Sequence, residues 1–219
     1  MILEYAFFIS QAAISSSDQA TTLLDLMMKG GIIMIPIVLL SLISIYIFIE
    51  RMAYIKRMTS IDDGLLMAVL NELRGGNHKN ALLHTRNNQA AIGRILENGI
   101  EKIGKPSVEV ERNLETMTNL EITKMEKNTG YLGIIAGVAP MLGFIGTISG
   151  VIKIFYNISL ADNISIGIIA GGLYQKMICS GAGLIVGVLA YAAYHYIQMR
   201  IDRYTIKLQE YLIQFLKVI

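Results

Sequence analysis

The sequence predicts an all-α integral membrane protein with three transmembrane helices and long helical extensions. Three long stretches carry almost no charged side chains. Hydrophobic residues make up 53% of the 219 residues and charged residues only 16%, whereas globular domains carry roughly 25% charged residues. The mean hydropathy of +0.52 points the same way. The positive charges are concentrated in two of the segments that separate or follow the apolar stretches.

The first apolar stretch predicts a transmembrane helix over residues 29–50. Between Lys29 and Glu50 it reads GGIIMIPIVLLSLISIYIFI, without a charged residue. A helix of about twenty residues covers about 30 Å, the thickness of the hydrocarbon core. Residues 1–13 lack the basic start of a signal peptide and contain Glu4, so we expect the segment 1–28 to remain as a tail.

The polar segment 51–127 predicts several amphipathic helices. Its apolar residues recur at intervals of three and four, and glycines at Gly75, Gly76 and Gly104 interrupt the pattern. The pattern of the last helix continues as far as Lys127. This helix can therefore run unbroken into the next membrane helix.

Two further apolar stretches predict the second and third membrane helices. The second has no charged side chain over more than twenty residues, and the third is interrupted only by Lys176. The tail after the third stretch returns to an amphipathic pattern. The expected boundaries are 128–155 for the second helix, 156–165 for a short loop, 166–197 for the third helix and 198–219 for the tail helix.

The positive charges predict the orientation. The segment 51–127 holds twelve Lys and Arg and the tail after residue 197 holds four, whereas the loop 156–165 holds none. Basic segments stay on the cytoplasmic side of a membrane. We therefore expect the N-terminus outside and the C-terminus in the cytoplasm. The net charge of +2 is too small to suggest a nucleic-acid partner.

Small residues form a stripe along the second membrane helix. They recur at intervals of three and four and therefore share one face. A face without large side chains lets another backbone approach closely, or it can line a narrow lumen. The stripe consists of Gly133, Ala136, Pro140, Gly143 and Thr147.

The third membrane helix repeats this arrangement, with Lys176, Ser180, Gly183 and Gly187 on roughly one face. Gly183 and Gly187 form a close-packing pair. Thr147 and Ser180 are then hydroxyls at membrane depth on two small-residue faces. Each hydroxyl can bond a carbonyl one turn back in its own helix. Their matching positions favour a polar lumen instead.

Three segments resemble the ExbB/TolQ/MotA proton-channel family, especially its ExbB and TolQ branch. APMLGFIGTISGVIKIF (139–155) is similar to the family signature in the second membrane helix. GGLYQKMICSGAGLIVGVLA (171–190) is similar to the third helix, and residues 30–52 to the first. The resemblance covers nearly the whole chain beyond the first twenty-odd residues.

This resemblance implies a homopentameric ring in the inner membrane of a Gram-negative bacterium, so that the outer segments 1–28 and 156–165 are periplasmic. The ring would surround the single transmembrane helix of an ExbD- or TolR-like partner. Proton flow would power movement that reaches outer-membrane processes, with a TonB- or TolA-like transducer as a further partner. No cofactor or metal is implied, and membrane lipid is the surrounding medium.

The resemblance also assigns residues. Thr147 matches the pore-lining threonine of the family, and Ser180 stands where a second threonine is usual. Gln175 replaces a usual glutamate, Leu189 a common proline, and Lys176 a small residue. The expected proton path is therefore Thr147, Ser180, Gln175 and Lys176, and the resemblance implies that its carboxylate belongs to the partner.

Two interpretations of Lys176 follow from its position. A lysine close to the start of the third helix can extend to the outer interface and leave only its stem in the apolar layer. Alternatively it faces the lumen and pairs with an acid of the partner. His195 lies at the cytoplasmic end of the same helix, where an interfacial role is favoured.

The sequence therefore favours a proton-driven stator over a non-conducting scaffold that packs and docks a single-helix partner. The small-residue stripe fits both functions, whereas the paired hydroxyls and the family signature fit the first. An intramembrane enzyme is disfavoured, because the sequence offers no acid pair, ligand cluster or nucleophile with a base. Cys179 has no base on its own helix, and we interpret it as a packing residue.

Overall fold

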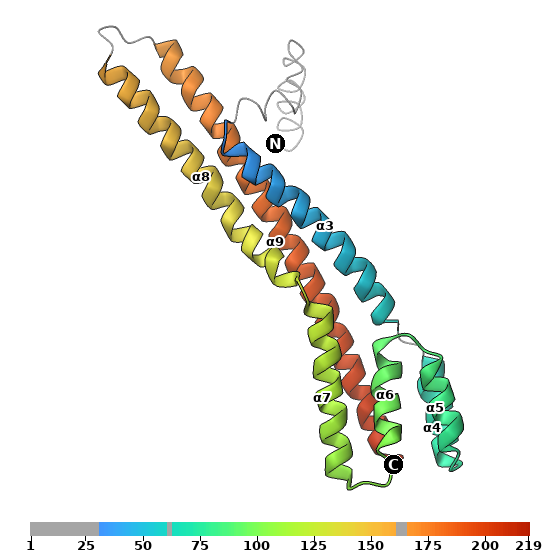
Figure 1. The fold of residues 1–219 in the computed structure, drawn as a ribbon. Helices are drawn as coiled ribbons and strands as arrows, with labels where there is room; N and C mark the ends of the chain where they lie inside the picture. Colours follow the sequence, from blue (N-terminus) through green and yellow to red (C-terminus); the bar gives the residue numbers. More distant parts are fainter. Residues whose placement is uncertain (1–30, 61–62, 161–165) are drawn as a thin grey trace, which may run out of the picture. The chain divides into compact units, whose positions relative to one another are not determined.

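A computed structural model describes residues 31–60, 63–160 and 166–219, which form α-helices without any strand. The predicted tail 1–28 and residues 161–165 of the predicted loop lie outside the described residues. The helices are α3 (Met34–Met58), α4 (Asp63–Arg74), α5 (His78–Arg86), α6 (Ala91–Glu101), α7 (Ser107–Glu126), α8 (Thr129–Ser159) and α9 (Ile166–Leu216) (Figure 1).

The helices α3, α8 and α9 are each long and apolar enough to cross a membrane. Less than a third of the most apolar window of each helix is buried within the chain. A soluble fold would bury these surfaces, whereas lipid or neighbouring protein can cover them in a membrane. The prediction of an all-α membrane protein with three spanning helices is thereby confirmed for the described part of the chain.

The helices α7 and α8 are separated at Lys127 and Asn128, so the amphipathic helix does not run unbroken into the membrane helix. Asn128 has a φ of 65°, in the left-handed region that Asn tolerates better than most residues. The Thr129 hydroxyl donates to the carbonyl of Glu126 at 2.7 Å and ties the two helix ends together. A local backbone preference at Asn128 has thus overridden a continuous apolar pattern.

In contrast, α9 continues through the boundary that was expected near residue 197. Its 51 residues correspond to about 77 Å of helix, more than twice the hydrocarbon thickness. The change from an apolar to an amphipathic pattern therefore occurs within one helix. The change in composition near residue 197 indicates where the side chains pass from apolar to polar surroundings. It does not end the helix.

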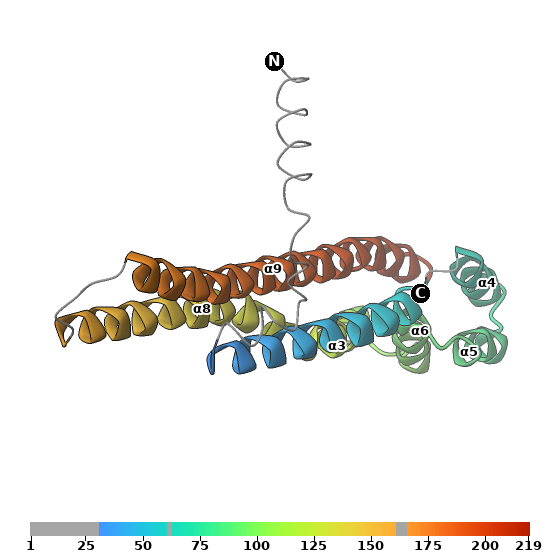
Figure 2. The ribbon, with the colours of Figure 1, turned by 90° about the horizontal axis from the view of Figure 1, so that it is seen from above.

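Contacts between residues divide the chain into two compact units. The apolar unit contains the described residues up to Val38 together with Ala139–Ile185. The core unit contains Leu39–Val138 and Val186–Ile219. In the apolar unit, α8 and the first part of α9 run side by side, as Figures 1 and 2 both show.

The core unit holds a conventional hydrophobic core, in which α6, α7 and the end of α9 lie side by side (Figure 1). Helix α6 buries Ile92, Ile95 and Leu96 on one face. Full burial of such a side chain stabilises a fold by roughly 1.5–3 kcal/mol. At Gly99 a Cβ atom would lie 2.8 Å from Leu114 Cδ2 and 2.9 Å from Phe215 Cε1, so this glycine allows a close helix approach.

Candidate functional site

The site predicted from the sequence lies along the interface between α8 and α9 in the apolar unit. The two backbones approach closely at small residues. A Cβ atom at Gly143 would lie 3.0 Å from the Cα of Ser180, and a Cβ atom at Gly183 would lie 2.5 Å from the carbonyl oxygen of Ala139. Both glycines are therefore needed for this close packing, in which small residues let the two backbones make van der Waals contact.

The interface continues toward the end of α8. A Cβ atom at Gly146 would lie 2.9 Å from the Sγ atom of Cys179, and Cys179 is fully buried. A Cβ atom at Gly172 would lie 2.6 Å from Cδ1 of Ile154. Cys179 thus fills the space left by a glycine, as expected for a packing residue.

Lys176 lies across α8 at Gly150. The Cγ, Cδ and Cε atoms of the lysine occupy the position that a Cβ atom at Gly150 would need. The ammonium group extends further, and its Nζ atom would be 3.6 Å from a Cβ atom at Gly31, which precedes α3. The apolar stem is therefore packed on helix backbone, while the charge reaches the level where α3 begins.

Thr147 lies beside this interface and not within it. Its hydroxyl donates to the carbonyl of Phe144 at 2.7 Å, one turn back in the same helix. The side chain is half-buried, as are the other small residues on this flank of α8. These flanking residues are Gly133, Ala136 and Pro140. The predicted stripe thus divides into Gly143, which is packed, and a flank that the chain itself leaves half open.

Ser180 lies on the same edge of the interface as Thr147. Successive residues of an α-helix are about 100° apart, so Gly143 and Gly146 are on opposite sides of the line where α8 faces α9. Gly143 meets Ser180 and Gly146 meets Cys179, so Ser180 occupies the side of Gly143. Thr147 lies about 40° around the helix axis from Gly143, on the side away from Gly146.

The remaining predicted residues have varied surroundings. Gly187 is buried, and its role in close packing stays a prediction. Gln175 belongs to α9, but its side chain lies outside the described part of the structure. The His195 ring makes edge contacts with Tyr191 and Tyr194, at centroid distances of 4.2 Å and 5.2 Å. Rings of this kind gather where a membrane helix meets the interface.

A buried ionic cluster in the core unit was missed by sequence reasoning. The Glu121 side chain is only 2% exposed, and its carboxylate accepts from Arg94 Nη2 at 2.6 Å and from Lys124 Nζ at 2.7 Å. The signal was present in the sequence, because Glu121 falls in the buried stripe of α7. That stripe also contains Val110, Leu114, Thr118 and Met125.

The same region of the core unit contains Tyr204 of α9, which is 4% exposed. Burial raises the pKa of the Tyr204 phenol, and the Glu121 carboxylate acts in the same direction. The phenol therefore stays neutral at any physiological pH. The ion pair between Arg94 and Glu121 thus connects α6 with α7 in the core unit.

Comparison with known proteins gives a consistent result. Residues 87–210 match the MotA/TolQ/ExbB proton channel family. A biopolymer transport protein ExbB homologue of Methanothermobacter thermautotrophicus is 29% identical over 183 residues, which cover 83% of this chain and 64% of that protein.

Two further relatives are informative. The biopolymer transport protein ExbB-like 1 of Synechocystis is 30% identical over 176 residues, which are 78% of this chain and 69% of that protein. The Tol-Pal system protein TolQ of Haemophilus influenzae is 28% identical over 91 residues, 42% of this chain and 40% of that protein. The chain thus spans about two thirds of the length of the Methanothermobacter and Synechocystis relatives, and less than half of the TolQ relative.

Proposed function

Because the chain belongs to the MotA/TolQ/ExbB proton channel family, we propose that it is the channel-forming stator subunit of an ion-driven motor. It acts as a ring of five copies in the bacterial inner membrane, around an ExbD/TolR-like partner with one transmembrane helix. The proton motive force then drives outer-membrane transport or envelope processes, with a TonB- or TolA-like transducer receiving the movement.

The observation that carries this proposal is the shared edge of Thr147 and Ser180. Both side chains are half-buried in the single chain and lie beside a close-packed interface. A hydroxyl facing lipid has no water to replace its second hydrogen bond, so a polar neighbour or a wet lumen is favoured at this edge. A ring in which this edge faces inward provides both.

The proton acceptor is proposed to come from the partner. The second membrane helix carries no Asp or Glu, and the third has none before Asp202. Intramembrane proton paths use titratable side chains, and a hydroxyl alone is no substitute for one. Thr147 and Ser180 therefore orient water or the partner's carboxyl group, and Gln175 adds an amide where a carboxylate would otherwise stand.

The geometry of Lys176 supports the first of its two interpretations. Its stem is packed against Gly150, and its ammonium group reaches the start of α3. This is how a lysine near a helix end places its charge at the interface. We therefore propose that Lys176 anchors the periplasmic end of the bundle and is not part of the proton path.

The orientation is part of the proposal. The twelve Lys and Arg of residues 51–127 and the four after residue 197 favour the cytoplasmic side for both segments. The start of α3 and the loop between α8 and α9 are then periplasmic. A proton entering from the periplasm would meet Ser180 and Thr147 before it reached the cytoplasmic helices.

The test is proton flux into liposomes that contain the chain together with its single-helix partner. Thr147→Val and Ser180→Ala each remove one hydroxyl, and we expect flux to fall about tenfold in each, in line with a lost hydrogen bond of about 1–3 kcal/mol. Ser159→Ala is the matched control, because the Ser159 hydroxyl also bonds a carbonyl three residues back, near the end of α8. Unchanged flux in the Thr147/Ser180 double variant would contradict a conducting role for these hydroxyls.

A non-conducting scaffold remains the second candidate, because the Thr147 hydroxyl already has a partner in its own helix. A scaffold would bind the partner helix through the small-residue flank of α8 without any flux. The same liposomes separate the two functions. Partner binding with no proton flux in the unmodified chain would favour the scaffold.

A further inference from the structure

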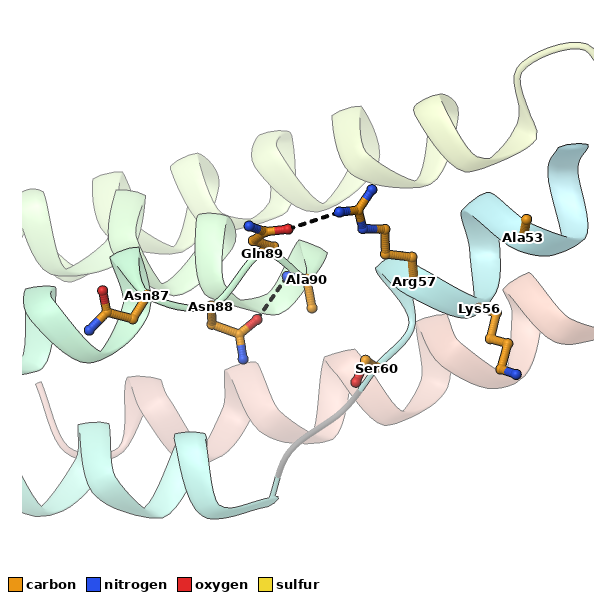
Figure 3. Close-up of a pocket in the computed structure, with 8 residues that line it drawn as sticks. All are labelled: Ala53, Lys56, Arg57, Ser60, Asn87, Asn88, Gln89 and Ala90. Carbon is orange, nitrogen blue, oxygen red and sulfur yellow. Dashed lines mark hydrogen bonds between the residues drawn. The ribbon is translucent and has the colours of Figure 1, made fainter.

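A polar pocket lies in the core unit where α3 ends beside the loop between α5 and α6 (Figure 3). Its volume is about 540 Å³. Two cations of the last turn of α3, Lys56 and Arg57, line it together with Ser60. The opposite side consists of the amide side chains of residues 87–89 and the start of α6. None of the described residues that line the pocket is acidic.

The groups around this pocket are hydrogen-bond donors for an anion. Arg57 Nη2 donates to Gln89 Oε1 at 3.2 Å, as Figure 3 shows, and this bond uses one of five guanidinium N–H groups. The Asn88 side chain accepts from the backbone N–H of Ala90 at 2.8 Å, which holds the loop in place. Helix α6 starts next to Ala90 with no side-chain cap and no acidic residue in its first turn, so its positive end is not neutralised there.

The position of the pocket along α3 indicates where the anion comes from. Glu50 comes directly after the uncharged stretch. Lys56 and Arg57 lie about 9–11 Å further along the same helix. The headgroup layer of a bilayer is about 5–8 Å thick, and a lysine or arginine side chain covers the remaining distance. Arg51 lies nearer to the apolar layer, but it is buried, paired with Glu50, and donates to the carbonyl of Lys124.

We propose that this pocket binds the phosphate of an anionic phospholipid headgroup from the cytoplasmic leaflet. The shared chemistry is a phosphate group held by Lys56, Arg57 and loop amides, and the depth of the pocket assigns that phosphate to a lipid. This goes beyond the channel function, because the pocket belongs to the core unit, whereas Thr147 and Ser180 belong to the apolar unit. A bound headgroup would connect α3 to the loop before α6 and hold the polar helices against the membrane surface.

The test is native mass spectrometry of the purified full-length chain with equal amounts of phosphatidylglycerol and phosphatidylcholine. We expect retention of phosphatidylglycerol in preference to phosphatidylcholine. Lys56→Gln and Arg57→Gln should each weaken binding about fivefold, and the double variant about 25-fold. Arg57→Lys should retain most of the affinity. Both side chains are exposed, so these variants leave the hydrophobic core intact.

The matched control is the double variant Arg74→Gln/Lys79→Gln, which removes two exposed cations elsewhere in the core unit. It should bind phosphatidylglycerol like the unmodified chain. Equal losses in both double variants would overturn the proposal, because they would show a general effect of charge. No preference between the two lipids would overturn it as well. Displacement of the lipid by millimolar inorganic phosphate or ATP would assign the pocket to a free phosphate and overturn the lipid assignment.

Discussion

The side chain of Lys176 passes directly over the backbone of Gly150, in the space that any larger residue at position 150 would fill. An intramembrane lysine normally costs about 2.5–3.5 kcal/mol on insertion scales. Here its stem is covered by a helix backbone, and its charge lies at the start of α3. The lysine stem therefore requires a glycine at position 150, because any Cβ atom there would overlap it.

We predict that Gly150→Ala destabilises the chain by about 1–3 kcal/mol, because the new methyl group overlaps the lysine stem. Lys176→Ala in the same background should recover most of this loss. Gly137→Ala is the control, because a Cβ atom at Gly137 would have no neighbour within 4 Å. Thermal unfolding of the detergent-solubilised protein compares these three variants with the unmodified chain. A double variant as unstable as Gly150→Ala would show that the two positions are not coupled.

We predict that Lys176→Met leaves proton flux and its dependence on pH unchanged. Met has a similar length and keeps an apolar stem over Gly150, while the charge at the interface is lost. A charge beside the proton path would instead shift the pKa of the partner's carboxyl group and move the pH profile. Proton flux across a range of pH values, in liposomes that contain the partner, therefore distinguishes an interfacial Lys176 from one beside the proton path. A displaced profile would place the ammonium group in the lumen.

Gly183→Ala should weaken the α8–α9 interface. Its Cβ atom would lie 2.5 Å from the carbonyl oxygen of Ala139 and 3.1 Å from the Cα of Gly143, and both are backbone atoms that cannot rotate away. We expect a loss of about 1–3 kcal/mol and reduced assembly on size-exclusion chromatography. Gly181→Ala, with no neighbour within 4 Å, should behave like the unmodified chain.

The larger substitution Gly143→Phe extends this prediction to the facing helix. A phenyl group cannot fit against the backbone of Ser180, so assembly should fail altogether. Normal assembly and full flux in this variant would mean that the α8–α9 interface is not the one that forms in the membrane.

In the core unit, Glu121→Gln should cost about 1–3 kcal/mol of stability, because Arg94 and Lys124 lose their shared carboxylate partner. Glu97→Gln is the matched control, since its pair with Arg86 is far more exposed than that of Glu121, and solvent-exposed pairs contribute about 0–1 kcal/mol. Chemical denaturation followed by circular dichroism provides the comparison. Equal effects in both variants would show that burial of Glu121 adds nothing to the pair.

The three membrane helices could be predicted from the sequence because lipid imposes one strong requirement, a long stretch without charge. The internal geometry of the site could be predicted only in part. A period of 3.6 residues places Gly143 and Thr147 on one face, but that face is wide enough to hold both a packed line and an open flank. Whether a residue of α8 belongs to the packed line or to the open flank depends on the register of α9 against α8. No local sequence pattern encodes that register.

Glu121 shows a different limit. The helical spacing of α7 places Glu121 in line with its buried residues. A charged residue at such a position is nevertheless expected to be exposed until its partners are known. Arg94 comes from another helix, 27 residues earlier, and only the folded chain brings the two together. Sequence patterns describe one element at a time, whereas ionic clusters depend on several.

The break at Asn128 has a consequence for the bilayer itself. A helix that starts at Thr129 leaves its first amide groups without partners in its own helix, and α7 leaves its last carbonyl groups in the same condition. The Thr129 hydroxyl donates to the carbonyl of Glu126, and Arg51 donates to that of Lys124. Hydrocarbon cannot satisfy the remaining groups, so water or headgroups must reach this point of the chain. If this break lies at the membrane surface, as the proposed topology requires, the roughly twenty residues from Thr129 to Gly150 are enough to cross the hydrocarbon core. Amide hydrogen exchange should be fast at the break and slow immediately beyond it.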